Sequence, residues 1–247
     1  MIALVLAAGY ATRLYPLTKG FPKPLLEVQG KPVLSWLLDD LETIPGIDGY
    51  VIVSNHVFLP FFQEWSREHP LQRKVTILDD GSTENENRLG AVKDILFSID
   101  SLGLDDDLLV LAGDNVLEFS LKSFVDYFHQ KKASCILRFE ERDPERLRRT
   151  GVAEIDAEGR VLRMEEKPQD PKSTWAVPPF YCFTRDDVGH LSEAIGQGCK
   201  TDAPGSLVSW ACGRFPVWAM RMPAARFDIG NLESYKQVQK CYRGILC

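Results

Sequence analysis

Short apolar runs alternate with longer amphipathic stretches over the first 140 residues. Runs with the length and composition of strands lie at 2–7, 50–55, 74–80, 107–114 and 134–140. Stretches with the apolar spacing of helices lie at 31–44, 58–69, 88–100 and 121–132. Strands that alternate with helices predict right-handed βαβ units and a mostly parallel sheet.

The pattern changes after about Arg142. Two short strands are expected within 151–168, on either side of the turn at 157–159, and further strands at 176–184 and 215–222, with helices at 187–195 and 232–245. We therefore predict an α/β fold. It is expected to be Rossmann-like, with a mixed, mostly parallel sheet, helices on both faces, and a more antiparallel substrate-binding subdomain.

Composition and charge exclude several classes of protein. The 247 residues suffice for one large domain or at most two, and 45% hydrophobic with 26% charged residues is typical of a globular chain. A net charge of -6 argues against general nucleic-acid binding. No run reaches the ~18 apolar residues of a membrane helix. Six cysteines without a C-x-x-C pair favour a cytoplasmic protein with reduced thiols.

The loop after the first predicted strand is basic and rich in small residues. Between Ala7 and Pro24 it contains Arg13, Lys19 and Lys23 and no acidic residue. Small residues let backbone N–H groups approach a ligand, an arginine offers a planar fork for phosphate, and Lys23 is a point charge between two prolines. The loop thus predicts phosphate binding, although its charges could instead pair with acids elsewhere. Neither a Walker motif nor a G-x-G-x-x-G fingerprint is present.

This loop resembles the N-terminal signature of the sugar-1-phosphate nucleotidyltransferases, L-A-A/G-G-x-G-T-R-L-x-P-L/V-T followed by P-K-P-L. The matching positions are Gly9, Thr12, Arg13, Leu14, Pro16, Leu17, Thr18, Pro22, Lys23, Pro24 and Leu25. Ala11 replaces the usual second glycine. The family makes nucleotide sugars from an NTP and a sugar 1-phosphate, so the resemblance implies these two substrates and Mg²⁺ as the cofactor.

The resemblance also implies a nucleotide site and a metal site. The implied nucleotide-binding residues are Leu6, Ala7, Ala8, Gly9, Thr12, Arg13, Lys23, Leu89, Gly90 and Gly113. Asp114 of "GDN" and Asp228 of "RFDIGN" would hold the metal. Carboxylate oxygens suit Mg²⁺, a hard cation, but each aspartate could instead only start the element that follows it.

On the sugar-phosphate side, "EEKP" matches the family. By that resemblance Glu166 would accept hydrogen bonds from sugar hydroxyls and Lys167 would bind the sugar phosphate, together with Asn115 and Gly151. Without it, a charged hairpin end would be the favoured interpretation. The implied organisation is a single domain, 1–247, with a nucleotide-binding half at 1–140 and a sugar-phosphate-binding half at 141–247.

The expected reaction is a Mg²⁺-dependent in-line attack of the sugar phosphate on the α-phosphorus of the NTP. Its catalytic residues would be Arg13, Lys23, Asp114 and Lys167. No nucleic acid or membrane partner is expected, and relatives make a homo-oligomer an option. One alternative is a cytidylyltransferase of the same fold acting on a phosphate such as phosphocholine. A second is a non-catalytic nucleotide-sugar-binding protein, and an NAD-linked oxidoreductase is a distant third.

Overall fold

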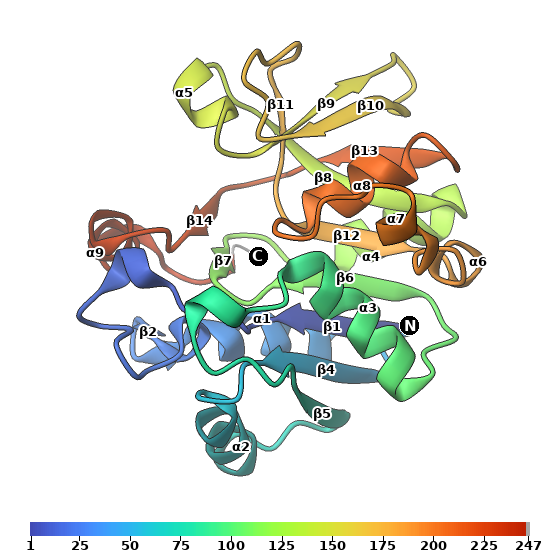
Figure 1. Ribbon diagram of the computed structural model, residues 1–247. Coiled ribbons are helices and arrows are strands. Elements are labelled where there is room, and N and C mark those ends of the chain that lie inside the picture. Colours follow the sequence, from blue (N-terminus) through green and yellow to red (C-terminus); the bar gives the residue numbers. More distant parts are fainter. Residues whose placement is uncertain (246–247) are drawn as a thin grey trace. The chain divides into compact units, whose positions relative to one another are not determined.

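The computed structural model describes residues 1–245 and divides the chain into two compact units (Figure 1). Of the described residues, unit 1 consists of 1–89, 112–122 and those from 223 onward, and unit 2 of 90–111 and 123–222. The predicted halves, 1–140 for the nucleotide and 141–247 for the sugar phosphate, are defined by the substrate that each would bind. This division stays a prediction. No helix among the described residues is long and apolar enough to cross a membrane.

Unit 1 is built on three parallel strands in the order β1-β4-β5. Its strands are β1 (Ile2–Leu6), β2 (Glu27–Val28), β3 (Lys31–Pro32), β4 (Gly49–Ser54), β5 (Lys74–Asp79), β7 (Asn115–Leu117) and β14 (Arg226–Asp228). Its helices are α1 (Val33–Glu42), α2 (Leu59–Glu68), α9 (Leu232–Cys241) and the short 3-10 helices η1 (Thr12–Leu14), η2 (Lys23–Leu25) and η3 (Asn85–Asn87). Strands β2 and β3 form a small hairpin, and β7 pairs antiparallel with β14.

Unit 2 is mainly antiparallel, with the strand order β10-β9-β11-β8-β12-β6 and β13 parallel to β8. Its strands are β6 (Leu108–Ala112), β8 (Ser134–Glu140), β9 (Gly151–Ile155), β10 (Val161–Glu166), β11 (Trp175–Val177), β12 (Phe180–Phe183) and β13 (Val217–Arg221). Its helices are α3 (Ala91–Leu102), α4 (Lys122–Lys131), α5 (Pro144–Leu147), α6 (Arg185–Val188), α7 (Glu193–Gly196) and α8 (Gly205–Ala211). The predicted α/β class with a mixed sheet is confirmed.

One apolar cluster in unit 1 ties the first loop to the C-terminal segment. Its buried members are Leu14, Leu26, Val28, Val33, Val116, Ile229, Val238 and Tyr242. Tyr242 packs edge-on against Trp36, with 5.2 Å between ring centroids, and its hydroxyl donates to the backbone oxygen of Leu117 at 3.0 Å. This packing holds η1, α1, β7, β14 and α9 together.

Three predicted elements differ from the structure. The strand expected at 176–184 is two strands, β11 and β12, because Pro178 and Pro179 interrupt the ladder. The helix expected at 187–195 is the separate short helices α6 and α7. The closing helix ends at Cys241 rather than Ile245, since the backbone of Tyr242 is extended while its side chain enters the core.

Candidate active site

Two carboxylates and one buried ammonium form a charged cluster in unit 1. The Nζ atom of Lys23 lies 2.5 Å from Oδ2 of Asp114 and 3.7 Å from Oδ1 of Asp228. Only 9% of the Lys23 side chain is exposed, against 32% for Asp114 and 50% for Asp228. Because burying an unpaired ammonium is costly, Lys23 is stable here through its two carboxylate partners.

Close packing around Gly113 sets the position of Asp114. The N–H of Gly113 donates to the backbone oxygen of Leu6 at 3.0 Å, directly after β1. A Cβ at this position would lie 2.9 Å from Cγ1 of Val5 and 3.3 Å from Cγ of Pro24. Only glycine fits without a shift, so "GD" brings a carboxylate to the end of β1 and to the loop that carries Lys23.

The β7–β14 ladder supplies the second carboxylate. Asp228 lies opposite Asn115 in this antiparallel pair, and the N–H of Ile229 donates to the backbone oxygen of Asp114 at 3.2 Å. Asn115 donates through Nδ2 to Oδ1 of Asp114 at 2.6 Å and accepts a hydrogen bond from Arg226 through Oδ1. Two segments more than a hundred residues apart in the chain thus meet at one pair of aspartates.

The two aspartates differ in pKa. Burial acts to raise the pKa of Asp114, but the charge and hydrogen bond of Lys23, with the charge of Arg226, outweigh it and hold that pKa below its usual value. Burial and the neighbouring negative charge of Asp114 raise the pKa of Asp228, against the opposing charges of Lys23, Arg226 and Arg13. Arg13 is therefore close enough to act electrostatically on the cluster.

The donor set fits a hard divalent cation. Both aspartates offer carboxylate oxygens, the ligand type that Mg²⁺ prefers, and both side chains are partly open to solvent. The described residues contain no group of three or more metal-ligating side chains, so a cation held here would take its other ligands from water or from substrate phosphates. This is the coordination that Mg²⁺ adopts in phosphate-processing sites.

Hydrogen bonds from other residues of unit 1 fix the conformation of the first loop. Asn55, fully buried after β4, donates through Nδ2 to the backbone oxygen of Ala8 at 3.0 Å and accepts from the N–H of Phe58 at 2.8 Å. Ala11 has φ 48° and ψ 42°, in the left-handed region, and its carbonyl accepts from the hydroxyl of Thr18 at 2.9 Å. The family signature has glycine where Ala11 stands, which the left-handed backbone explains.

The predicted nucleotide residues are divided between the two units. Unit 1 contains Leu6, Ala7, Ala8, Gly9, Thr12, Arg13, Lys23, Gly113 and, as the last residue of its first segment, Leu89. Gly90 begins unit 2, with φ 91°, and a Cβ there would lie 2.6 Å from the backbone oxygen of Thr201. Gly90 is thus required for the packing of α3 against the loop at 201–202.

Glu166 and Gly151 lie together in unit 2. They are opposite each other in the β9–β10 ladder, and Oε2 of Glu166 also faces Gly205 at the start of α8, where a Cβ would lie 1.9 Å away. Burial raises the pKa of Glu166, against the charge of Lys167. No hydrogen-bond donor contacts the Glu166 carboxylate within the described part of the chain, so its oxygens are open to a ligand hydroxyl.

Sequence reasoning missed Asn55, Arg226 and Gly205. Asn55 is the last residue of a predicted strand, and its position after an apolar run is the sequence signal that marks it. Arg226 stands two residues before a predicted metal ligand, but its partner, Asn115, is distant in the chain. Gly205 has no local signal, because its role depends on the side chain of Glu166.

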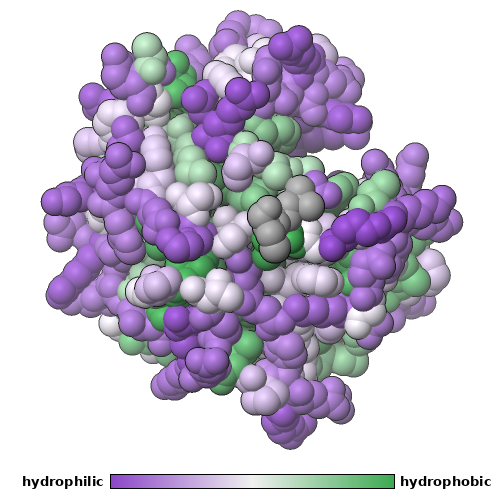
Figure 2. All heavy atoms as spheres, turned by 180° about the vertical axis from the view of Figure 1, so that it is seen from behind, coloured by the Kyte–Doolittle hydropathy of each residue, from purple (hydrophilic) through white to green (hydrophobic). Residues whose placement is uncertain are grey.

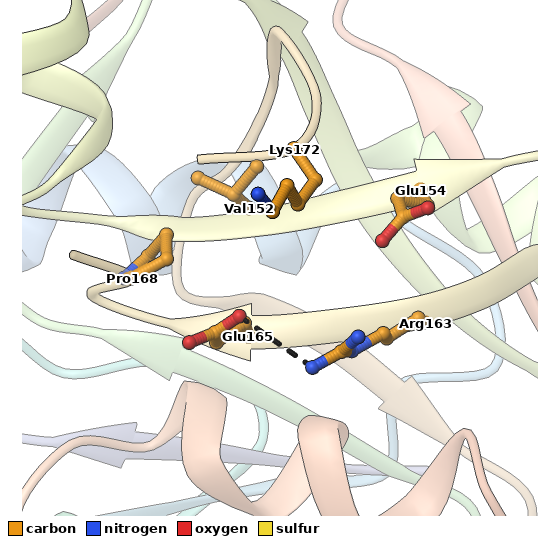
Figure 3. A pocket seen from close by; sticks show the side chains of 6 residues that line it. All are labelled: Val152, Glu154, Arg163, Glu165, Pro168 and Lys172. Carbon is orange, nitrogen blue, oxygen red and sulfur yellow. Dashed lines mark ion pairs between the residues drawn. The ribbon is translucent and has the colours of Figure 1, made fainter. Parts of the chain in front are cut away.

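A shallow hollow on unit 2 is a separate feature (Figure 3). It is lined by Val152, Glu154, Arg163, Glu165, Pro168 and Lys172. Neighbouring residues of a strand point to opposite faces, so Glu165 in this hollow and Glu166 lie on opposite faces of β10. The hollow is therefore not the site that holds Glu166.

Comparison with known proteins shows the family to which the chain belongs. The nucleotidyl transferase family model matches residues 2–243. A UTP–glucose-1-phosphate uridylyltransferase of Haloferax volcanii, AglF, is 32% identical over 97% of this chain and 96% of its own. A glucose-1-phosphate thymidylyltransferase of Mycobacterium tuberculosis is 29% identical over 95% of this chain and 79% of its own. The chain therefore belongs to the nucleotidyl transferase family.

A solved structure supports the fold. The apo form of a UDP-glucose pyrophosphorylase has a TM-score of 0.79 and 22% identity, covering 98% of this chain and 97% of that one. The predicted resemblance to sugar-1-phosphate nucleotidyltransferases is confirmed, and so are the α/β fold and the prediction that the protein is an enzyme.

Proposed function

We propose that this enzyme transfers a nucleotidyl group from an NTP to a sugar 1-phosphate, with release of pyrophosphate, in a Mg²⁺-dependent reaction. The observation that carries the proposal is the cluster in which buried Lys23 contacts both Asp114 and Asp228. The relatives are named for uridylyl and thymidylyl transfer to glucose 1-phosphate, so UTP, dTTP and glucose 1-phosphate are the first substrates to test.

In the proposed reaction, a phosphate oxygen of the sugar 1-phosphate attacks the α-phosphorus of the NTP. A new P–O bond forms, and the bond between the α-phosphorus and the oxygen that it shares with the β-phosphorus breaks. Pyrophosphate leaves with the electron pair of that bond. A phosphomonoester has its second pKa near ~6, so the nucleophile is already ionised near neutral pH and no general base is needed. Catalysis then depends on positioning and charge neutralisation.

The first loop would hold the triphosphate. Its small residues let backbone N–H groups approach phosphate oxygens, and Arg13 and Lys23 supply positive charge. Among the backbone hydrogen bonds that lie outside helices and strands in the described residues, none has an N–H group of residues 8–13 as its donor. Those groups therefore remain able to donate to an anion. We assign Arg13 to the leaving pyrophosphate and Lys23 to the reacting phosphates.

Asp114 and Asp228 would hold the metal. When bound, Mg²⁺ supplies charge neutralisation and orientation of phosphate oxygens. Asn115 and Arg226 orient Asp114 by the hydrogen bonds described above. Lys23 keeps Asp114 ionised, because its charge lowers the pKa of that carboxyl. An ionised carboxylate is the form that binds a cation.

Glu166, Lys167, Gly151 and Asn115 are the proposed sugar-phosphate residues. Glu166 presents a carboxylate without a hydrogen-bond donor in the described part of the chain, which suits sugar hydroxyls. The exposed Lys167, at φ 49°, follows it directly and would bind the phosphate. Gly151 leaves space beside Glu166, since a Cβ there would lie 3.2 Å from Oε2.

Pyrophosphate release tests the proposal. The common NTPs are crossed with a panel of sugar 1-phosphates and phosphocholine in the presence of Mg²⁺, with Asp114→Asn as the blank. A strong NTP and sugar pair that is lost in the variant supports the proposal. Turnover on phosphocholine alone would replace it by the cytidylyltransferase alternative, and nucleotide binding without turnover on any acceptor would replace it by a non-catalytic role.

Two further parts of the proposal concern location and assembly. We propose a cytoplasmic enzyme, supported by the five described cysteines, all of which are free; Cys247 lies outside the described residues. A homo-oligomer also stays a proposal. The face drawn in Figure 2 is mainly hydrophilic, with hydrophobic residues in separate patches. Size-exclusion chromatography with light scattering measures the assembly directly.

A further inference from the structure

Two arginines flank one tryptophan in unit 2. The guanidinium carbon of Arg138 lies 3.9 Å from the ring centroid of Trp175, and that of Arg221 lies 5.9 Å from the same centroid. Arg138 and Arg221 are direct partners in the parallel β8–β13 ladder. Two like charges are thus held side by side on neighbouring strands, an arrangement that is destabilising unless something compensates it.

No acidic side chain in the described part of the chain neutralises these two charges. Neither Arg138 nor Arg221 forms an ion pair with a described carboxylate, and Nε of Arg138 is buried without a hydrogen-bond partner. Glu140, the acid nearest to them in the ladder, bonds to Arg142 instead. Burial lowers the pKa of Arg138, and so does the positive charge of Arg221, against the opposing influence of Tyr127.

The strand registers place this pair on a defined face of the sheet. Trp175 is opposite Glu140, and residues two apart on a strand share a face, so Arg138 and Arg221 share the face of Trp175. In the β9–β10 ladder Glu166 is opposite Gly151, and in the β9–β11 ladder Gly151 is opposite Val177. Val177 shares the face of Trp175, because the two residues are two apart on β11. Glu166 therefore lies on this same face.

We propose that Arg138 and Arg221, backed by Trp175, form a binding site for an anionic group, a phosphate or a carboxylate. Guanidinium forks bind such groups through paired, charge-assisted hydrogen bonds, and a bound anion would neutralise the pair and give the buried nitrogen a partner. The Trp175 ring lies against the Arg138 guanidinium at 3.9 Å, which limits the freedom of that side chain, so less of its entropy is lost on binding.

The anionic group could come from two sources. It could be a second acidic group of the sugar 1-phosphate, because the pair shares the face of Glu166, or it could be a separate phosphorylated metabolite. The first source rests on the proposed function, whereas the second does not. The chemistry at the arginines is the same, and the test distinguishes the two.

Trp175 provides the readout, since an anion on the arginines changes its surroundings. The whole protein is titrated with inorganic phosphate, glucose 1-phosphate and glucuronic acid 1-phosphate at about 150 mM salt, where weak surface attraction is screened. Tryptophan fluorescence is followed in the wild type and in Trp175→Phe, and the difference isolates Trp175. Arg221→Gln and Arg138→Gln are the test variants. Arg163→Gln is the matched control, because this exposed arginine lies on the opposite face of the same sheet.

We expect a saturable change that depends on Trp175, with a Kd that rises at least about tenfold in each test variant and is unchanged in Arg163→Gln. Saturation with inorganic phosphate alone assigns a separate anion. Saturation with glucuronic acid 1-phosphate, but with neither of the other two, assigns an acidic acceptor. The proposal is overturned if no probe gives a Trp175-dependent change, or if the test variants bind like the control. The fluorescence titrations do not need turnover. Failure of the proposed reaction, which is measured by pyrophosphate release, can therefore be distinguished from failure of anion binding.

Discussion

Lys23 and Asp114 are 91 residues apart in the chain, yet Nζ of Lys23 lies 2.5 Å from Oδ2 of Asp114. The contact forms because two rigid features meet: a lysine on a stiff Pro-Lys-Pro segment, and an aspartate placed at the end of β1 by Gly113. Lys23 also lies 3.7 Å from Asp228, so one ammonium joins all three segments of unit 1.

Replacing Asp114 by Asn should reduce kcat by at least about 10²–10³-fold with little change in fold. The amide keeps the shape of the side chain but removes the negative charge that a cation needs. Steady-state pyrophosphate release measures the loss, and circular dichroism checks the fold. The exposed Asp186→Asn is the control for a general loss of charge. A folded Asp114→Asn protein with near-normal turnover would remove Asp114 from the mechanism.

Ala11→Gly should stabilise the protein by up to about 1 kcal/mol. A left-handed backbone costs an L-residue roughly 1–2 kcal/mol, and glycine at position 11 avoids this cost. Part of the resulting stabilisation is lost, because glycine gives the unfolded chain more conformational entropy. Ala8→Gly is the matched control, because Ala8 is in the same loop without a positive φ and should lose roughly 0.5–1 kcal/mol. Urea unfolding measures both. Equal destabilisation by the two changes would contradict a strained Ala11.

The first loop and the "GDN" and "RFD" motifs could be found in the sequence, because small, basic and acidic residues at these fixed spacings match the signature of the family. The sequence could not show that Asp228 lies opposite Asn115, since this depends on the distant β7–β14 pair. It also could not locate Gly205, because the space that this glycine leaves is occupied by Glu166, a residue distant in the chain. Elements were predicted well where apolar periodicity was long, as for α1, and poorly where prolines cut a continuous apolar run, as at Pro178.

Gly205→Ala should impair sugar-phosphate binding more than it impairs folding. A Cβ at position 205 would lie 1.9 Å from Oε2 of Glu166, and that carboxylate is the end of a flexible side chain that can move away. We expect KM for the sugar 1-phosphate to rise about tenfold, ~1.4 kcal/mol, with kcat and the Tm nearly unchanged.

Gly196→Ala is its control, because a Cβ there meets nothing within 4 Å. An unchanged KM in Gly205→Ala would show that the position of Glu166 does not matter for the acceptor. A large fall in Tm would instead indicate that α8, and not Glu166, gives way.

Gly90→Ala should have the opposite effect, with a large loss of stability. Here the added Cβ would lie 2.6 Å from the backbone oxygen of Thr201, which cannot move aside as a side chain does, and φ is 91°. Strain and overlap together should cost about 3 kcal/mol or more. Thermal unfolding compared with Gly196→Ala measures the cost. A Tm equal to that of the control would mean that the loop at 201–202 does not pack against α3.

Glu42 should make the stability of unit 1 dependent on pH. Its carboxylate is 13% exposed and accepts hydrogen bonds from the Tyr50 hydroxyl at 2.7 Å and the N–H of Gln72 at 2.7 Å, beside Arg73. Burial acts to raise the pKa of Glu42, but these hydrogen bonds and the charge of Arg73 outweigh it and lower that pKa. The stabilisation is therefore complete above the unfolded pKa of about 4.3 and is lost as the pH falls through the lower folded value.

Glu42→Gln should consequently lower the free energy of unfolding by about 1–3 kcal/mol near neutral pH and by less at about pH 3, where the wild-type carboxylate is increasingly protonated. Urea unfolding of both proteins across this range measures the difference. Glu64→Gln serves as the control, because this exposed carboxylate on α2 should show a small difference at every pH. If the Glu42→Gln difference stays constant down to about pH 3, the network depends on the shape of the side chain rather than on its charge.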